Sequence, residues 1–352
     1  MSHIVVLGGG YGGLEAIKQL IKKHTKQPFY ITLVDRHPFH SLKTQHHALA
    51  AGTLSDEKTR MKFPKHECLN VYYAEILRVD LKQRCVVTDR ETVYYDYLII
   101  ALGAEDKWQS LKGAQTFTRS LQTIEQTRKT YEEIQNTKPY GTIKIIGGGL
   151  TGVELASELR ESRKDLNIHI LERGHSVLKH FSPMIQSYVN EWFNAHDIQV
   201  KQRSHLEYIS DHAIYNNGQR EYADLIIWAA GIQPSHVVSK LQVEKDRFGR
   251  ILINRQSRLI SDKRVFVVGD CSSTPFFPSA QIAKQQGRIV GNSLLDELSH
   301  RAIKQKKGLT HKGTLGSLGR KVGFGAIGNR SLIGRVPKIM KNYVEYLHAK
   351  GH

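Results

Sequence analysis

Cysteine is scarce in this chain, and its spacing excludes one class of redox chemistry. The 352 residues contain three cysteines, Cys68, Cys85 and Cys271. They form no C-x-x-C or C-x4-C pair, so a redox-active dithiol is not expected. Few cysteines and no disulfide pattern are typical of a reducing compartment, here the cytoplasm. Each cysteine is interpreted as a small buried apolar residue.

Long apolar runs and a leader sequence are also missing. No stretch approaches the roughly 18 apolar residues that a membrane-spanning helix requires. Met1 leads almost directly into an apolar strand pattern, which predicts that there is no signal peptide. These absences favour a protein that is cytoplasmic, or peripheral on the cytoplasmic face of the cell membrane.

Acidic residues are outnumbered by basic ones. The chain has 33 Asp and Glu against 51 Lys and Arg, which gives a formal net charge of +18. Such a charge suits nucleic acid, an anionic membrane surface or anionic cofactors. The basic residues are spread along the chain and no nucleic-acid motif is present, so no nucleic-acid partner is expected. The length and a hydrophobic content of 40% allow two domains and a small third.

The chain does contain two copies of one nucleotide-binding signature. An apolar run leads into GGGYGG at residues 8–13, and another leads into GGGLTG at residues 147–152. After each helical pattern a second apolar run ends in an acid, Asp35 in the first copy and Glu172 in the second. A strand, a G-x-G-x-x-G turn, a helix and an acid at this distance are typical of a dinucleotide-binding unit. Two copies predict two dinucleotides, most simply a tightly held flavin and an exchanging nicotinamide.

The three glycines of each turn have different physical tasks. The first permits the tight turn out of the strand, the second lets the backbone approach the pyrophosphate, and the third lets the helix pack close to the strand. The pyrophosphate lies at the helix N-terminus, where amide N–H groups point outward. Glycine-rich turns without a ligand are the alternative for either copy alone. In order, the glycines are Gly8, Gly10 and Gly13 in the first copy and Gly147, Gly149 and Gly152 in the second.

A second repeat supports the first. YDYLIIALG at residues 95–103 resembles ADLIIWAAG at residues 223–231. Both are interpreted as a buried strand that ends in a turn of small residues, apolar on both faces as parallel strands covered by helices are. The duplication therefore covers whole nucleotide-binding units, and it predicts an α/β fold with two Rossmann-like domains.

A further strand pattern at residues 264–268 ends in Gly269 and Asp270. An acid at the carboxyl end of a parallel sheet is placed to reach a sugar or ribityl chain, and a strand-end turn is the alternative. We infer that the chain returns here to the first domain, so that the second domain is an insertion. The predicted domains are an FAD-binding domain at 1–107 and 241–308, an NAD(P)H-binding domain at 108–240 and a C-terminal membrane- or dimer-interface domain at 309–352.

Helical periodicity predicts helices at 124–134, 152–163 and 183–196. The last begins with Ser182 as N-cap and Pro183 at the first helical position.

The C-terminal residues change in composition. Glycines punctuate residues 308–334, which predicts a small antiparallel meander. After Pro337 the pattern predicts a basic amphipathic helix, which lies in a membrane interface or packs on its own protein or a partner subunit. Its apolar side holds Ile339, Met340, Tyr343, Val344, Tyr346 and Leu347, and its polar side holds Lys338, Lys341, Asn342, Glu345 and His348.

Together these residues resemble the pyridine nucleotide-disulfide oxidoreductase superfamily, and within it the type II NADH dehydrogenases, which are single-subunit NADH:quinone oxidoreductases. The resemblance covers nearly the whole chain. Its most specific parts are GGGLTGVE at 147–154, AQIAKQQG at 280–287 and GTLGSLG at 313–319. It implies an FAD enzyme that takes hydride from NADH and passes two electrons to a quinone, expected to be menaquinone, without proton pumping. It also implies a homodimer attached peripherally to a membrane surface.

The resemblance assigns roles residue by residue. Glu154 is expected near the flavin, as a proton relay or as a partner of bound water, and an exposed first-turn carboxylate is the alternative. Gln281 and Gln285 are expected in the quinone site; without the resemblance they are ordinary polar residues on a helix. No metal site is expected. The expected FAD contacts are Gly8, Gly10, Tyr11, Gly12, Gly13, Asp35, Arg36, Ala101, Gly103, Asp270, Ala280 and Gln281. The expected NAD(P)H contacts are Gly147, Gly149, Leu150, Thr151, Gly152, Glu172, Arg173, Ala230 and Gly231.

Two features depart from the family pattern. Typical members continue past the amphipathic helix, whereas this sequence stops at His352. We therefore expect a weaker, salt-sensitive membrane association. An acid such as Glu172 favours the free ribose hydroxyls of NADH, but the adjacent Arg173 accommodates the 2′-phosphate of NADPH. NADH is the predicted cofactor, and NADPH stays open.

Other functions remain as alternatives. A disulfide or sulfide:quinone reductase needs a positioned cysteine pair, which the cysteine count argues against. An NADH oxidase or ferredoxin-type reductase passes electrons to oxygen or to a protein. A catalytically quiet redox-sensing flavoprotein is reduced by NADH once but does not turn over with a quinone.

Overall fold

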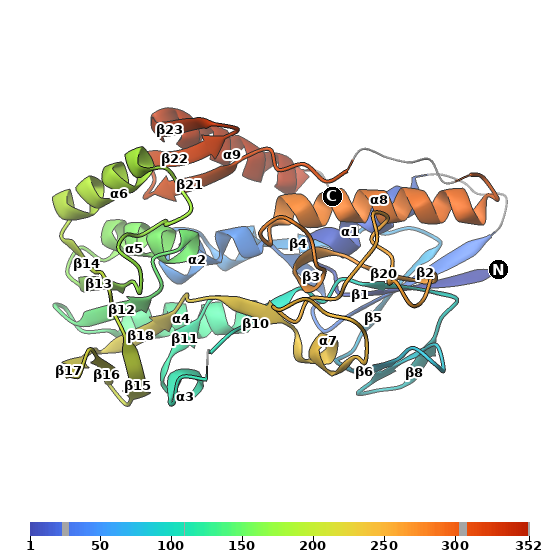
Figure 1. Ribbon diagram of the computed structural model, residues 1–352, viewed down its shortest axis with the longest axis horizontal. Coiled ribbons are helices and arrows are strands. Elements are labelled where there is room, and N and C mark those ends of the chain that lie inside the picture. Colours follow the sequence, from blue (N-terminus) through green and yellow to red (C-terminus); the bar gives the residue numbers. More distant parts are fainter. Residues whose placement is uncertain (23–27, 109, 303–307, 351–352) are drawn as a thin grey trace.

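The computed structural model describes residues 1–22, 28–108, 110–302 and 308–350. Figure 1 shows two lobes side by side, with a small C-terminal unit above the lobe that contains α5 and α6. Each lobe has a five-stranded parallel sheet, with helices on one face and a three-stranded antiparallel sheet on the other. The predicted α/β class with two Rossmann-like domains is therefore confirmed.

The sheet of the first lobe has the strand order β20-β9-β1-β2-β5. Residues 4–7 of its central strand are apolar and completely buried because both faces of the sheet are covered. The sheet strands are β1 (Ser2–Leu7), β2 (Phe29–Asp35), β5 (Leu69–Tyr73), β9 (Tyr97–Ile100) and β20 (Val265–Val267). The covering elements are α1 (Tyr11–Ile21) and α8 (Ala280–Leu298) on one face, and β6 (Ile76–Asp80), β7 (Cys85–Thr88) and β8 (Thr92–Tyr94) on the other.

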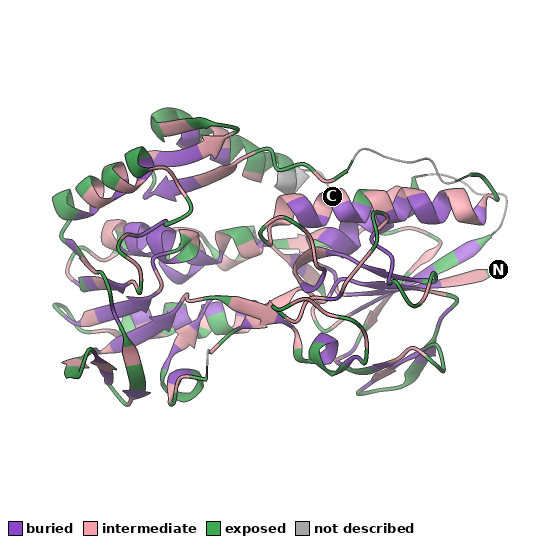
Figure 2. Ribbon diagram, in the orientation of Figure 1, coloured by how far each residue is buried: buried purple, intermediate pink, exposed green. Residues whose placement is uncertain are grey.

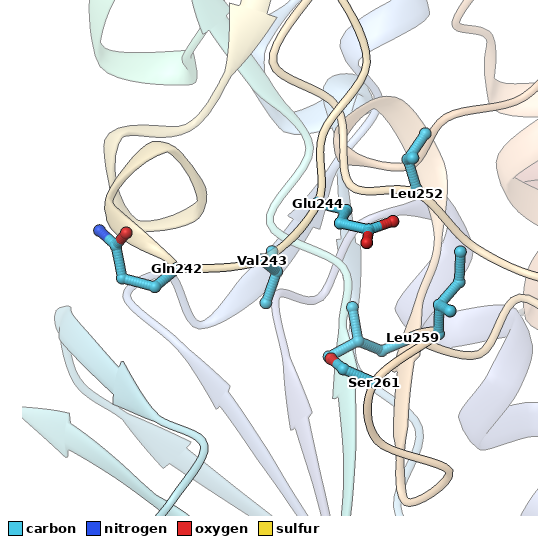
Figure 3. Close-up of a pocket in the computed structure, with 7 residues that line it drawn as sticks. Gln242, Val243, Glu244, Leu252, Leu259 and Ser261 are labelled. Atoms are coloured by element: carbon cyan, nitrogen blue, oxygen red, sulfur yellow. The ribbon is translucent and has the colours of Figure 1, made fainter.

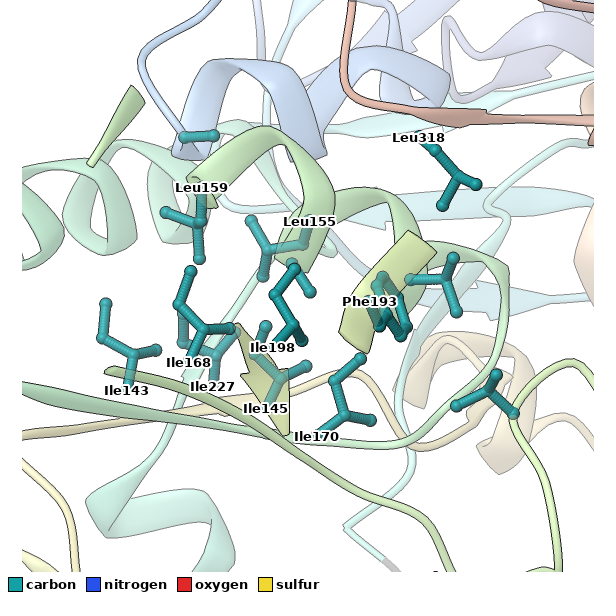
Figure 4. Close-up of a cluster of buried hydrophobic side chains, with 14 of the residues drawn as sticks. Ile143, Ile145, Leu155, Leu159, Ile168, Ile170, Phe193, Ile198, Ile227 and Leu318 are labelled. Carbon is teal, nitrogen blue, oxygen red and sulfur yellow. The ribbon is translucent and has the colours of Figure 1, made fainter. Parts of the chain in front are cut away.

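The second lobe repeats this plan with the strand order β11-β18-β12-β13-β14. The apolar residues of β12 and β13 pack against the helices, as Figure 4 shows for Ile145, Ile168 and Leu155. The sheet strands are β11 (Arg119–Ser120), β12 (Thr142–Ile146), β13 (Asn167–Leu171), β14 (Ile198–Lys201) and β18 (Leu225–Trp228). The covering elements are α4 (Ile124–Asn136), α5 (Leu150–Ser162) and α6 (Pro183–Ala195), and β15 (Leu206–Ser210), β16 (Ala213–Asn216) and β17 (Gln219–Tyr222).

Two paired strands connect the lobes. β10 (Ala104–Asp106) leaves the first lobe and β19 (Ile232–Pro234) returns to it, and the two strands pair antiparallel. After the return, α7 (His236–Lys240) and β20 join the core of the first lobe. The second lobe is thus inserted into the first, as predicted. The boundaries at residues 107, 240 and 308 stay predictions.

The C-terminal unit is the predicted meander followed by a helix. It consists of β21 (Thr314–Leu318), β22 (Val322–Ile327), β23 (Arg330–Gly334) and α9 (Arg335–Lys350). Leu318 and Phe324 are completely buried in the hydrophobic core of the second lobe. The unit is therefore packed on the second lobe, and Figure 4 shows Leu318 above the side chains of α5.

The three helices predicted from periodicity are confirmed as α4, α5 and α6, and Ser182 caps α6 by accepting a hydrogen bond from the backbone N–H of Ile185. Among the described residues, no helix combines the length and apolar character needed to cross a membrane. The remaining short elements are β3 (Phe39–Ser41), β4 (Arg60–Lys62), α2 (His46–Ala50), α3 (Ala114–Phe117) and the 3-10 turns η1 (Lys43–Gln45), η2 (Asp56–Thr59) and η3 (Gly269–Cys271).

Candidate active site

The outer glycines of each turn are required by the fold itself. Gly8 has φ +95°, and a Cβ on it would lie 2.6 Å from the Ala101 carbonyl oxygen. A Cβ on Gly13 would lie 2.2 Å from the Gly8 carbonyl oxygen. In the second lobe a Cβ on Gly147 (φ +111°) or on Gly152 would meet backbone oxygens at 2.7 Å and 2.0 Å. These four positions close the strand-to-helix turn, as the fingerprint predicts.

The middle glycines are not required by the fold. Gly10 has φ −78° and ψ −174°, an extended conformation that any residue adopts, and a Cβ on it would meet no atom within 4 Å. Gly149 has φ −76° and ψ −176°, and a Cβ on it would also meet nothing. Each glycine leaves free space at the N-terminus of a helix, where backbone N–H groups favour a phosphate. The residues of both lobes therefore fit the pyrophosphate of a dinucleotide.

The two predicted ribose acids make equivalent bonds in the two lobes. Asp35 accepts hydrogen bonds from the backbone N–H groups of Gly9 at 2.6 Å and of His37 at 2.8 Å. Glu172 accepts hydrogen bonds from the backbone N–H groups of Gly148 at 2.8 Å and of Gly174 at 2.7 Å. A carboxylate has about four acceptor positions, so each acid fastens its glycine turn and retains capacity for ribose hydroxyls.

The other predicted nucleotide contacts surround these turns. Gly103, after β9, has φ +62°, and a Cβ on it would meet no atom within 4 Å. The Tyr11 hydroxyl lies 3.0 Å from Thr44 Oγ1, and burial raises its pKa to about 12. Gly12 lies between the end of β20 and α8, where a Cβ would approach the Val268 side chain to 2.9 Å and the Ala283 carbonyl oxygen to 3.3 Å. The remaining contacts are Ala101 after β9, Ala230 and Gly231 after β18, Leu150 and Thr151 at the start of α5, Ala280 at the start of α8, and the exposed Arg36 and Arg173 beside the acids.

Three ionisable side chains, Lys43, Asp106 and Asp270, lie near one another beyond the ends of β9 and β20 without forming an ion pair within 4 Å. Lys43 of η1 donates a hydrogen bond from Nζ to the Ala104 carbonyl oxygen at 3.3 Å. Burial lowers its pKa, although the charges of Asp270 and Asp106 oppose that shift. Burial raises the pKa of Asp270 and raises that of Asp106 to about 6. Sequence reasoning identified only Asp270, because no motif marks the other two residues.

Glu154 is buried in a cluster that the C-terminal unit completes. Its carboxylate accepts hydrogen bonds from the backbone N–H of Ser317 at 3.0 Å and from the Ser317 hydroxyl at 3.1 Å, and it forms an ion pair with Lys341 of α9. His47 of α2 lies 3.8 Å away on the other carboxylate oxygen. Glu154 is only 5% exposed, so the alternative of an exposed first-turn carboxylate is wrong. Neither His47 nor Lys341 was predicted as a site residue.

The cluster holds Glu154 in its ionised form. Burial opposes ionisation, but the charge and hydrogen bond of Lys341, with the backbone N–H of Ser317, outweigh it and lower the pKa of Glu154. The same pairing raises the pKa of Lys341 against its own burial. Burial lowers the pKa of His47 to about 3, so this imidazole is neutral at pH 7. Glu154 is therefore a hydrogen-bond acceptor at neutral pH, and the Lys341 ammonium is the proton-bearing group in contact with it.

Gln281 and Gln285 connect α8 to the segment that precedes β21. Gln281 accepts from the backbone N–H of Lys312 at 2.7 Å and donates to the Gly313 carbonyl oxygen at 3.2 Å. Gln285 accepts from the backbone N–H of Thr310 at 3.0 Å and donates to its carbonyl oxygen at 2.7 Å. Both amides therefore fasten the C-terminal unit to the first lobe. Nearby, the buried Gln286 accepts from the backbone N–H of Gly269 at 2.8 Å, a contact with the Asp270 turn that no motif indicated.

Helix α9 turns its apolar side outward. Val336, Ile339 and Tyr343 are 60%, 66% and 60% exposed, whereas Lys341 is 8% exposed and faces the Glu154 cluster. Figure 2 shows exposed residues along this helix. The predicted separation of apolar and polar sides holds for these residues, but Asn342 is exposed although it was assigned to the polar side. His348 was also predicted on the polar side, and its side chain lies outside the part of the chain that the structure describes. An apolar stripe of this kind marks a surface for a membrane or a partner.

A separate hollow of about 430 Å³ lies in the first lobe, and Figure 3 shows the side chains around it. No predicted site residue lines it. Its lining residues are Gln242, Val243, Glu244, Leu252, Leu259, Ile260 and Ser261.

Comparisons with known proteins agree with this geometry. Residues 2–287 match the family model described as pyridine nucleotide-disulphide oxidoreductase. The chain is 43% identical over 350 residues to the NADH dehydrogenase-like protein YutJ of Bacillus subtilis (strain 168), covering 99% of each chain. It is 26% identical over 380 residues to a type II NADH:quinone oxidoreductase of Staphylococcus haemolyticus (strain JCSC1435), covering 97% of this chain and 94% of that one.

A solved structure shares the fold. NDH2 from Plasmodium falciparum in complex with NADH superposes with a TM-score of 0.83 at 18% identity, covering 99% of this chain and 94% of that one.

Proposed function

Because the chain belongs to the pyridine nucleotide-disulphide oxidoreductase family, we propose that it is an FAD-dependent NADH:quinone oxidoreductase of the type II class. The observation that carries the proposal is the pair Gly10 and Gly149, which the fold does not require and which leave space at a helix N-terminus in each lobe. One chain with two such sites is suited to hold two dinucleotides at once. Family membership makes the protein an oxidoreductase, and the quinone is the finer part of the proposal.

FAD and NADH supply the redox chemistry when they are bound. The chain positions them: the turn at 8–13 holds the FAD pyrophosphate, Asp35 its ribose and Asp270 its ribityl chain. The turn at 147–152 and Glu172 hold the nicotinamide dinucleotide in the same way. NADH is the expected nucleotide because a carboxylate repels a 2′-phosphate, and Arg173 keeps NADPH as the alternative.

The three described cysteines support a quinone rather than a disulfide as acceptor. Cys68, Cys85 and Cys271 are all free thiols. Burial raises the pKa of each thiol, for Cys271 to about 12, and so disfavours the reactive thiolate.

The quinone is assigned to the junction of the two lobes with the C-terminal unit. Gln281 and Gln285 meet residues 310–313 there, and Glu154 meets Lys341. Reduction of a quinone consumes two protons, and Glu154 with its partner Lys341 is proposed as the buried relay for one of them. In this structure the side-chain amide N–H groups of both glutamines donate to backbone carbonyl oxygens. A bound quinone carbonyl would replace one of these oxygens as the acceptor. Menaquinone is the expected acceptor, and electron transfer proceeds without proton pumping.

The exposed apolar side of α9 is assigned to a membrane surface. The net charge of +18 adds attraction to anionic lipid, which favours peripheral binding at the cytoplasmic face. A homodimer is the expected assembly.

Steady-state turnover of the purified, FAD-loaded protein tests the proposal. NADH oxidation should be at least about tenfold faster with a menaquinone analogue than with oxygen alone, and faster with NADH than with NADPH. The control is Gly149→Val, which should abolish turnover and keep the yellow flavin. Turnover with oxygen or a protein alone would indicate an oxidase or ferredoxin-type reductase. Flavin reduction without quinone turnover would indicate a redox sensor.

A further inference from the structure

Lys43 is a part-buried basic residue that the proposed mechanism has not used. It lies in η1, and its Nζ donates to the Ala104 carbonyl oxygen at 3.3 Å. Ala104 directly follows Gly103, where an added Cβ would meet no atom within 4 Å. The ammonium therefore lies at the same strand-end turn that faces open space.

The hydrogen bonding of Lys43 is incomplete within the described chain. An ammonium has three donors, and Ala104 O accepts one of them. No carboxylate of the described residues lies within 4 Å of Nζ, although Asp106 and Asp270 are close enough to act on its charge. A part-buried ammonium with unused donors favours a further acceptor beside it. The chain thus places a positive charge with spare donors beside the space in front of Gly103.

We propose that Lys43 donates a hydrogen bond to the polar edge of the flavin ring and that its charge favours the reduced form of bound FAD. The inference rests on the FAD site of the proposed function. Hydride transfer moves two electrons and one proton, breaks a C–H bond of NADH and releases NAD⁺. The neutral oxidised ring thereby gains one negative charge until a further proton arrives. A cation at the ring edge stabilises this charge, and the nearby Asp106 carboxylate partly offsets it.

The alternative role for Lys43 is purely structural, since its bond to Ala104 also fixes the turn after β9. The two roles differ in what they do to the redox potential. A structural lysine affects FAD occupancy and stability, whereas a charge at the ring shifts the balance between oxidised and reduced flavin.

The test is the midpoint potential of bound FAD, measured by spectroelectrochemistry at pH 7 without NADH or quinone. Lys43→Met should shift the equilibrium at a given potential at least about tenfold toward oxidised flavin, which is about 30 mV for a two-electron couple. Lys43→Arg keeps the charge and should stay close to the wild type. Asp106→Asn removes the opposing charge, so its potential should shift in the other direction.

An unchanged potential in Lys43→Met with full FAD occupancy would overturn the proposal. If Lys43→Met does not retain FAD, the test rests on Asp106→Asn. An FAD midpoint potential that is unchanged or lower in Asp106→Asn would contradict a cation at the flavin ring. The measurement uses neither NADH nor quinone. An unchanged midpoint potential would therefore refute the role of Lys43 without refuting the quinone as acceptor. Absence of quinone turnover would refute the acceptor without refuting the role of Lys43.

Discussion

Two glycines with ordinary backbone angles mark the nucleotide sites at the scale of single residues. Gly13 cannot be replaced, because a Cβ would lie 2.2 Å from a backbone oxygen. Gly10 has no such neighbour and no left-handed conformation. A glycine that neither packing nor backbone strain demands is best explained by a ligand that approaches the main chain.

Gly10→Val should remove FAD without harming the fold. The new side chain fills the space in front of α1, so bound FAD should fall to near zero. Stability should change by no more than about 0.5 kcal/mol, as for other substitutions without clashes. Absorbance at the flavin band and thermal melting by circular dichroism measure both.

Gly149→Val is the matched variant in the other lobe. This variant should retain bound FAD and lose flavin reduction by NADH, because the new side chain fills only the dinucleotide site of the second lobe. Loss of FAD in Gly149→Val, or full FAD in a folded Gly10→Val, would reverse the assignment of the two lobes.

Gln281→Ala and Gln285→Ala should slow reoxidation of the flavin by a menaquinone analogue. Loss of one hydrogen bond worth about 1.4 kcal/mol in the transition state slows that step roughly tenfold. Reduction by NADH should stay near normal, since the nucleotide arrives from the second lobe. Asn292→Ala is the control on the same helix, because its side chain bonds the Arg288 carbonyl oxygen within α8. Equal slowing of both steps would indicate a damaged flavin site instead.

Local motifs account for part of the site at this scale. The glycines and the two acids were predictable because they belong to one continuous strand–turn–helix–strand pattern, although Asp35 and Glu172 lie 26 and 24 positions from the glycines they bond. Lys341 was not, since it reaches Glu154 across 187 positions of sequence. Lys43 was not predictable either, because a lysine before a short helix has no signal until the fold brings Ala104 of β10 beside it.

At the scale of elements, α9 combines a correct prediction with an unexpected orientation. Its amphipathic period was visible in the sequence. The period does not say which side packs inward, and an apolar side is normally buried. Here the ion pair of Lys341 with Glu154 fixes the polar side against the protein, and Ile339 and Tyr343 face outward.

The outward side of α9 predicts peripheral membrane binding. Ile339→Asp and Tyr343→Asp should each weaken flotation with anionic liposomes about tenfold, for a loss of roughly 1.5 kcal/mol of apolar burial per residue. Added salt or neutral lipid should weaken the binding of the wild type as well, because charge attraction is screened. Asn342→Ser, an exposed polar position on the same helix, should have no effect.

Two outcomes would contradict this assignment. Flotation that does not depend on lipid charge or salt would refute the electrostatic part. Absence of flotation, together with a dimer that Ile339→Asp dissociates, would assign the face to a second copy of the chain.

At the scale of the whole molecule, the duplicated pattern made the architecture predictable. The strands β9-β1-β2 and β18-β12-β13 occupy equivalent places in their sheets. The strand pattern at β20, which returns the chain to the first lobe, indicated in the sequence that the second lobe is an insertion. The junction of three units was not predictable, because it depends on where the C-terminal unit packs. Gln281 and Gln285 bond residues 310–313, and Glu154 bonds Ser317 and Lys341, so both sets of contacts depend on where the C-terminal residues pack.

Anaerobic double-mixing stopped flow on the wild-type protein tests the central claim most directly. The FAD-loaded protein is mixed first with one equivalent of NADH and then with a menaquinone analogue, and the flavin absorbance is followed. We predict that NADH bleaches the flavin band and that the quinone restores it at least as fast as steady-state turnover requires. Flavin that stays bleached after the quinone is added, while oxygen or a protein acceptor restores it, would contradict assignment of this chain as a quinone reductase.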